Sequence, residues 1–107
     1  MRRFTISVSL QVLYPITDGT EFDYDYYLST HMNLVAEHMG PHIERTLVTK
    51  GNAGGPDLPP SIYAIATIVF PDQDAMGAAL KSSAPVMADI PNFTNAEPQI
   101  LIGDVVG

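Results

Sequence analysis

Apolar and polar residues alternate along the first segment of the chain. In residues 4–14 (FTISVSLQVLY), every second residue is apolar, and the residues between are mostly Ser, Thr and Gln. Strict alternation over this length predicts a β-strand that turns one face toward a core. The other face carries no charge, which suits a surface that a second sheet covers.

A helical pattern follows over residues 24–39. Apolar and aromatic residues recur there at three- and four-residue spacing, and Asp23 stands where an N-cap residue would lie. Gly40-Pro41 predicts the end of this helix, with the glycine in the left-handed conformation and the proline unable to continue it. His31 lies in the middle of the inward stripe, one turn after Tyr27.

The rest of the chain predicts three more strands and a second helical layer. We expect strands at residues 42–50, 62–70 and 99–105, a Gly- and Pro-rich loop at 51–61, a helix from Asp72 to Ser82-Ser83, and a short helical piece at 84–90. The order β-α-β-β-α-β is that of the ferredoxin-like α+β fold, with a four-stranded antiparallel sheet and both helices on one face. A chain of 107 residues has the size of one domain, residues 1–107.

This arrangement leaves one face of the sheet without helices. The strands carry apolar residues on both faces, so a monomer would expose an apolar surface, and such surfaces mark interfaces. We therefore expect a homodimer that packs through the bare sheet faces.

Composition excludes several classes of function. Twelve acidic and five basic residues give a formal charge of −7, which argues against nucleic-acid binding. The absence of cysteine excludes disulfides, thiol nucleophiles and Cys-ligated metals. No apolar run is long enough to span a membrane and no signal-peptide pattern is present, so we expect a cytoplasmic protein without membrane contact.

His31 is the leading candidate for chemistry. A histidine on the inward face of a helix is tunable near neutral pH and suits general acid–base catalysis, although a core histidine with one hydrogen bond would give the same pattern. His38 suits the negative end of the helix, and the break at Gly40-Pro41 separates it from His42. The spacing of the three histidines does not favour a metal site, and we expect none.

Other residues suit the walls of a ligand pocket. Tyr14 and Tyr27 offer phenol groups that can orient a carbonyl or phenolic ligand. Asp89 is either a general base or a helix cap, and Asn92 stands near it in the last loop. Met32 is an adaptable apolar side chain, suited to core packing or to a pocket wall.

Two separated motifs carry a resemblance to a known family. They are Leu13-Tyr14-Pro15 with FDYDYY at residues 22–27, THM at 30–32 and Leu34-Val35, and then DIPNFT at residues 89–94 followed by Pro98. This pattern resembles the EthD family, named for ethyl tert-butyl ether degradation, which belongs to the dimeric α+β barrel superfamily. The family's signature histidine matches His31. The family usually has Pro after His-Met, where this chain has Asn33.

The resemblance implies a role in catabolic or secondary metabolism, such as ether or aromatic compound degradation. Relatives in the superfamily include isomerases, cofactor-free monooxygenases, and cyclases or dehydratases. One hypothesis is therefore a small enzyme in which His31 moves protons in isomerisation, dehydration or oxidation of an apolar, oxygen-bearing ligand, without a cofactor. A second is a non-catalytic accessory or carrier protein for an oxygenase pathway. A third, a purely structural dimer, applies only if no pocket exists.

Overall fold

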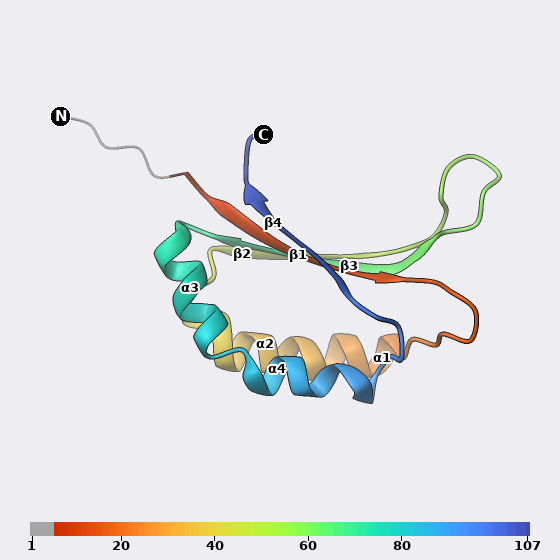
Figure 1. Cartoon of the computed structure of the whole chain (residues 1–107), viewed down its shortest axis with the longest axis horizontal. Coiled ribbons are helices and arrows are strands. Elements are labelled where there is room, and N and C mark those ends of the chain that lie inside the picture. The colour runs from red at the N-terminus through yellow and green to blue at the C-terminus, as the bar shows by residue number, and fades with distance from the viewer. Residues whose placement is uncertain (1–5) are drawn as a thin grey trace.

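A four-stranded antiparallel sheet forms one layer of the protein in a computed structural model that describes residues 6–107. The strands are β1 (Val8–Pro15), β2 (Arg45–Lys50), β3 (Ile62–Phe70) and β4 (Gln99–Asp104), in the order β2-β3-β1-β4 (Figure 1). The longest pairing is between β1 and β3, the two central strands. This confirms the ferredoxin-like α+β class expected from the order of elements.

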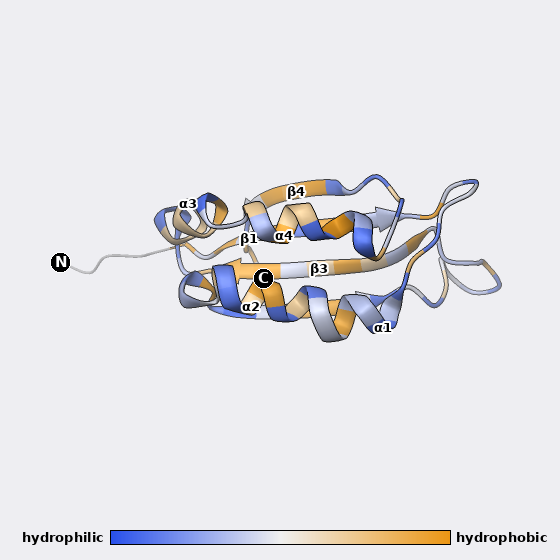
Figure 2. Cartoon of the chain, turned by 90° about the horizontal axis from the view of Figure 1, so that it is seen from below, coloured by the Kyte–Doolittle hydropathy of each residue, from blue (hydrophilic) through white to orange (hydrophobic). Residues whose placement is uncertain are grey.

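All helices lie on one face of this sheet (Figures 1 and 2). The first helical layer comprises α1 (Tyr24–Tyr26), the π-helical turn η1 (Tyr27–His31), α2 (Met32–Met39) and the 3-10 turn η2 (Gly40–His42). The second comprises α3 (Gln73–Lys81), α4 (Ala84–Asp89) and the 3-10 turn η3 (Ile90–Asn92). The two predicted N-caps are confirmed, because Asp23 accepts a hydrogen bond from the N–H of Tyr26 and Asp72 one from that of Ala75.

The core lies between the helices and the central strands. Alternate residues of β1 face the helices and are buried, and each pairs with a buried residue of β3: Val8 with Phe70, Leu10 with Ile68, and Tyr14 with Ala64. Burial of each large side chain stabilises the fold by about 1.5–3 kcal/mol. The alternation in the sequence therefore identifies the inward face of β1 correctly.

The first helix differs from the expected continuous α-helix. Its middle is a π-helical turn, in which the N–H of Met32 donates to the carbonyl of Tyr27, five residues before it. At the far end, Gly40 is right-handed, with φ of −52°, so the predicted left-handed stop is wrong. The chain instead tightens into a 3-10 turn that accepts Pro41, because the first residues of a helix need no N–H partner.

Strand boundaries differ from the expected ones at several ends. The first strand begins at Val8, and residues 4 and 5 of the predicted strand lie outside the described residues. The second begins at Arg45 rather than at residue 42, because the 3-10 turn occupies the preceding positions. The strand at 62–70 is confirmed, and the last strand ends at Asp104.

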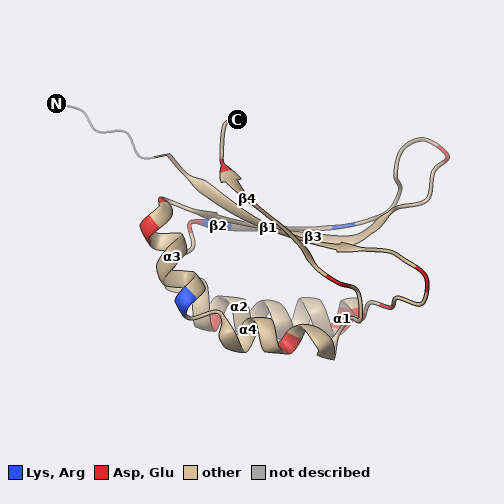
Figure 3. Cartoon of the chain, in the orientation of Figure 1, with Lys and Arg blue, Asp and Glu red and all other residues tan. Residues whose placement is uncertain are grey.

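The face of the sheet away from the helices is open and nearly uncharged. By register, its apolar members are Leu13, Leu47, Ile65, Val69 and Leu101. They alternate with Ser, Thr and Gln, so this open face is mixed rather than continuously apolar. Figure 3 shows that most acidic residues lie on loops and helices instead. In residues 6–107, no helix is long and apolar enough to cross a membrane.

Candidate functional site

His31 ends the π-helical turn and faces the core. It is 4% exposed, and its Nδ1 lies 3.0 Å from Oδ2 of Asp89, the last residue of α4. A backbone hydrogen bond of 2.8 Å from Asp23 to Phe93 ties the start of the first helix to the end of the second helical layer. The two helices that carry His31 and Asp89 are thereby held side by side.

Asp89 is held by two further donors. The hydroxyl of Tyr26 donates to its Oδ1 at 2.6 Å, and Nδ2 of Asn92 donates to the same atom at 2.9 Å. Burial alone would raise the pKa of Asp89, but the hydrogen bonds from Tyr26, Asn92 and His31 outweigh burial and lower this pKa below its usual value. Asp89 is therefore an ionised acceptor with a fixed orientation.

The neighbours of His31 define its protonation. Burial lowers the pKa of its imidazole, and the hydrogen bond and charge of Asp89 oppose this effect without cancelling it. A neutral imidazole beside a carboxylate donates its Nδ1–H to that carboxylate, which leaves the lone pair on Nε2. The same arrangement orients the histidine base of hydrolytic triads. His31 is thus a neutral base with its tautomer selected by Asp89.

A small internal cavity adjoins His31. Its volume is about 40 Å³, and it lies between the central strands and the two helical layers. The lining residues are Leu10, Val12, Tyr14, Tyr27, His31, Met32, Val35, Met39, Ala66, Ile68, Leu80, Ser83, Val86, Met87 and Ile90. Among these described residues there is no Lys, Arg, Asp or Glu, so the cavity is apolar apart from its phenols, its imidazole and one serine.

Tyr27 lines this cavity and carries an unsatisfied hydroxyl. The side chain is fully buried, and its oxygen has no hydrogen-bond partner among the described residues. Burial raises the pKa of Tyr27 to about 12, so the group remains a protonated donor at neutral pH. Burial likewise raises the pKa of Tyr14, whose side chain also lines the cavity. An unpartnered buried hydroxyl is uncommon and costs stability, which makes it a candidate ligand contact.

Aromatic rings fix the positions of these groups. The rings of Tyr27 and His31 stack with centroids 5.6 Å apart, and both rings belong to the π-helical turn. The ring of Phe93 lies 4.5 Å from His31, 5.0 Å from Tyr27 and 5.5 Å from Tyr14. Edge-to-face and stacked rings of this kind pack rigidly. The site therefore has an ordered aromatic wall.

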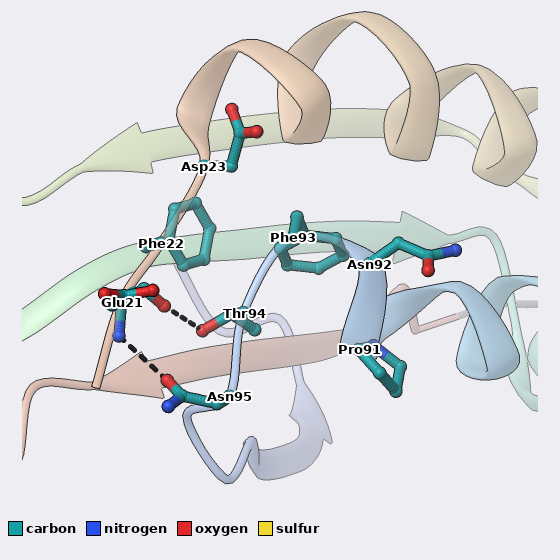
Figure 4. A pocket seen from close by; sticks show the side chains of 8 residues that line it. All are labelled: Glu21, Phe22, Asp23, Pro91, Asn92, Phe93, Thr94 and Asn95. Atoms are coloured by element: carbon teal, nitrogen blue, oxygen red, sulfur yellow. Dashed lines mark hydrogen bonds between the residues drawn. The ribbon is translucent and has the colours of Figure 1, made fainter. Parts of the chain in front are cut away.

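The residues predicted from sequence fall into two groups. Tyr14, Tyr27, His31 and Met32 meet around the cavity. Asp89 and Asn92 do not line this cavity: Asp89 bonds to the imidazole of His31, and Asn92 bonds to Asp89. Asn92 instead lines an open surface groove of about 420 Å³, in which the side chains of Thr94 and Asn95 form hydrogen bonds with the backbone of Glu21 (Figure 4).

Two contributors were not singled out from the sequence. Tyr26 binds Asp89, although the helical period places it beside rather than within the inward stripe, and Phe93 packs on His31 from the last loop. Contacts between segments more than sixty residues apart leave no local signal. All three histidines lie within residues 6–107, and only His31 lines the cavity. Nε2 of His38 lies 3.9 Å from Oε2 of Glu37. In that same range, no three potential ligands gather that could hold a metal ion.

Fold and site together define a ferredoxin-like protein with a buried His–Asp pair beside an apolar cavity. A family model described as the EthD domain matches residues 18–97, which include every residue of the pair and of its hydrogen-bond network. The chain belongs to the EthD family.

Solved structures agree with this assignment. An EthD-like protein from Ralstonia eutropha is 31% identical, with 97% of this chain and 96% of that chain covered and a TM-score of 0.86. An ethyl tert-butyl ether degradation (EthD) family protein from Bacillus halodurans is 20% identical, with 94% and 99% covered and a TM-score of 0.75. A dimeric ferredoxin-like protein of unknown function from Thermobifida fusca is 8% identical, with 94% and 92% covered and a TM-score of 0.64. None of the curated proteins matches the sequence.

Proposed function

We propose that the protein binds a small, neutral, oxygen-bearing apolar molecule in the internal cavity and moves a proton on it with His31. The observation that carries this proposal is the buried imidazole, which borders the cavity while Asp89 holds its Nδ1 at 3.0 Å. General acid–base catalysis needs a base that is neutral at working pH and fixed within reach of the proton. The lowered pKa of His31 and its contact with Asp89 support this role.

The charge around the cavity supports a neutral ligand. No cationic side chain lines it, and the carboxylate of Asp89 lies directly behind His31. A buried carboxylate or phosphate would have no counter-charge there, and an unpaired buried ion is strongly disfavoured. A carbonyl or phenol oxygen, by contrast, can accept the hydrogen bond that the Tyr27 hydroxyl has available.

The proposed chemistry needs no cofactor. Nε2 of His31 takes a proton from the carbon next to the ligand carbonyl, and the Tyr27 hydroxyl donates to the enolate oxygen that forms. Return of the proton to a different atom gives isomerisation. In a β-hydroxy ketone, the imidazolium instead gives the proton to the hydroxyl that leaves the β-carbon, so that water departs and His31 is neutral again. Tyr14 and Met32 shape the wall against which the ligand lies. Asp89 keeps the imidazole oriented and stabilises its protonated form.

Deuterium exchange tests the proposal without knowledge of the natural ligand. Acetophenone is a neutral aryl ketone with exchangeable methyl protons, and the wild-type protein in D₂O should accelerate their exchange, followed by NMR. His31→Asn should reduce this acceleration by roughly 10²–10⁴-fold, the usual value of general acid–base catalysis. His38→Asn is the matched control, since it makes the same change on the same helix outside the cavity, and it should leave the rate unchanged. Equal rates for the wild type and His31→Asn would refute the catalytic role.

A carrier function is the second candidate, and one observation favours it. Among the described residues that line the cavity, His31 is the only one that titrates near neutral pH, so the cavity has no second acid or base for a two-step proton transfer. In this case the same cavity binds the ligand and His31 only donates or accepts a hydrogen bond. Acetophenone would then bind without measurable exchange in any variant.

We propose the setting from the family's name and from the fold. The ligand would belong to ether or aromatic compound degradation in the cytoplasm, with an oxygenase pathway as its source or destination. We also propose a homodimer that forms through the open sheet faces. The nearly uncharged character of that face supports it, as does the similarity in fold to a protein described as dimeric.

A further inference from the structure

The cavity beside His31 is too small for the ligand that it should bind. Its volume is about 40 Å³, whereas pockets for small-molecule ligands usually measure roughly 300–1,000 Å³. A ring-containing ketone therefore enters only if part of the wall moves. This reasoning rests on the proposed function, because it takes that ligand as given.

The exposure of the lining residues locates the opening. Tyr14 and Tyr27 at the inner end are at most 1% exposed, but Leu80 is 39% exposed and Met87 is 46% exposed. Both exposed residues belong to the second helical layer, at the end of α3 and in α4. Met32 of α2 is partly buried and borders the same cavity. The cavity thus approaches solvent along the seam between α2 and α4, which lie side by side in Figure 2.

The walls of the cavity differ in how firmly they are held. The sheet wall is held by the continuous pairing of β1 with β3. The wall formed by α4 has only six residues, follows the break at Ser82-Ser83 and passes into the 3-10 turn that contains Pro91. Short helices between such breaks shift as units, because few backbone hydrogen bonds join them to their neighbours. The end of α4 is joined to the first helical layer by the hydrogen bonds of Asp89 to Tyr26 and His31, so these are the contacts that a displacement of α4 would break.

We infer that α4 is the movable wall of the site and that Met87 determines the size of the ligand that enters. Methionine is unbranched and polarisable, so its side chain can turn aside for a ligand and then pack against it. Leu80 flanks Met87 on the solvent side and contributes to the same selection. The chemical class admitted is a neutral aryl or alicyclic ketone.

The position of Asp89 links entry to the orientation of the base. Asp89 lies two residues after Met87 on the same helix and holds the imidazole of His31. Displacement of α4 therefore separates the carboxylate from the imidazole, and its return restores the contact. His31 is oriented for proton transfer only when the wall has closed over the ligand.

Size selectivity tests this inference by binding alone. The probes are acetophenone and the bulkier 2-acetonaphthone, titrated into the protein and followed by NMR. Met87→Ala should raise the affinity for 2-acetonaphthone relative to acetophenone by about tenfold, since removal of a few methylene-sized groups from a pocket changes discrimination by 10- to 200-fold. Met87→Trp should shift the ratio the other way, and Leu80→Ala should act in the same direction as Met87→Ala.

Two controls separate this inference from the proposed function. Leu58→Ala removes an exposed apolar side chain from a loop that does not line the cavity, and the ratio of its two ketone affinities should equal that of the wild type. His31→Asn should keep the wild-type ratio of the two ketone affinities even if it no longer accelerates deuterium exchange. Unchanged deuterium exchange in His31→Asn would refute the catalytic role without affecting the inference about α4. The inference would be overturned if all Met87 and Leu80 variants had the wild-type ratio of the two ketone affinities. It would also be overturned if no variant bound either ketone.

Discussion

The hydroxyl groups of Tyr26 and Tyr27 are adjacent in sequence and opposite in their hydrogen bonding. The first donates to Asp89 at 2.6 Å, and the second is buried without a partner. Such a difference cannot be deduced from the six aromatic and acidic letters at residues 22–27. Tyr27 lines the cavity, whereas Tyr26 contacts Asp89 at the end of α4.

Removal of the Tyr27 hydroxyl and removal of the Tyr26 hydroxyl should therefore change the stability in opposite directions. Tyr27→Phe should raise the free energy of unfolding by about 1 kcal/mol, because it removes an unsatisfied buried polar group. Tyr26→Phe should lower the same free energy, because Asp89 loses a donor. Urea unfolding of both variants measures this directly. Tyr27→Phe should also weaken the binding of acetophenone, and a stabilised variant with unchanged ketone affinity would argue against Tyr27 as a ligand donor.

At the scale of elements, the sequence predicted the positions of strands and helix starts well. Alternation identified β1 and its buried face, and the N-caps Asp23 and Asp72 were found from their residue type and position. Periodicity did not reveal the π-helical turn, because one extra residue in a turn barely changes the spacing of apolar positions. The left-handed conformation expected from Gly40-Pro41 was also wrong, because Gly40 is right-handed and begins a 3-10 turn.

Asn33 explains how the turn forms without the proline that the family usually has there. Its side-chain amide donates to the carbonyl of Ser29, four residues before it, within the irregular part of the helix. This bond satisfies a carbonyl that a proline at residue 33 would leave to solvent. The shape of the first helix is thus compatible with either residue.

Proline substitutions test this account of the helix. Asn33→Pro should cost less of the free energy of unfolding than a proline in the regular part of the helix, because residue 33 directly follows the π-helical turn, where the helical hydrogen-bond pattern is already irregular. Ala36→Pro, in the middle of the same helix, should cost about 3 kcal/mol or more. Thermal or urea unfolding compares the two. Similar losses in both variants would show that residue 33 lies in regular helix.

At the scale of the whole molecule, charge distribution favours one mode of self-association. The chain carries twelve acidic residues and a formal charge of −7, so most of its surface repels a second copy. Among the paired strand residues that lie on the open face of the sheet, Arg45 of β2 is the one charged residue. Two copies can therefore meet there without acid–acid repulsion.

Light scattering at micromolar concentration should give about twice the chain mass of 11.6 kDa. Leu47→Glu and Leu101→Glu place a carboxylate on the open face and should shift the protein toward the monomer. Leu28→Glu alters a similarly exposed leucine on the first helix and should leave the dimer intact. A wild-type protein that stays monomeric, or equal behaviour of all three variants, would contradict this interface.

The imidazole of His31 offers the most direct test of the central claim. Nitrogen NMR of the histidine side chains, with His31→Asn for assignment, reports both the tautomer and the pKa. We predict a proton on Nδ1, a pKa below the usual value of about 6.5 because burial disfavours the charged form, and a shift of Nε2 when acetophenone binds. The neutral base is then fully formed above pH 6.5 and is lost as the pH falls toward the lowered pKa. A proton on Nε2, a raised pKa, or an Nε2 signal unaffected by the ketone would contradict the account.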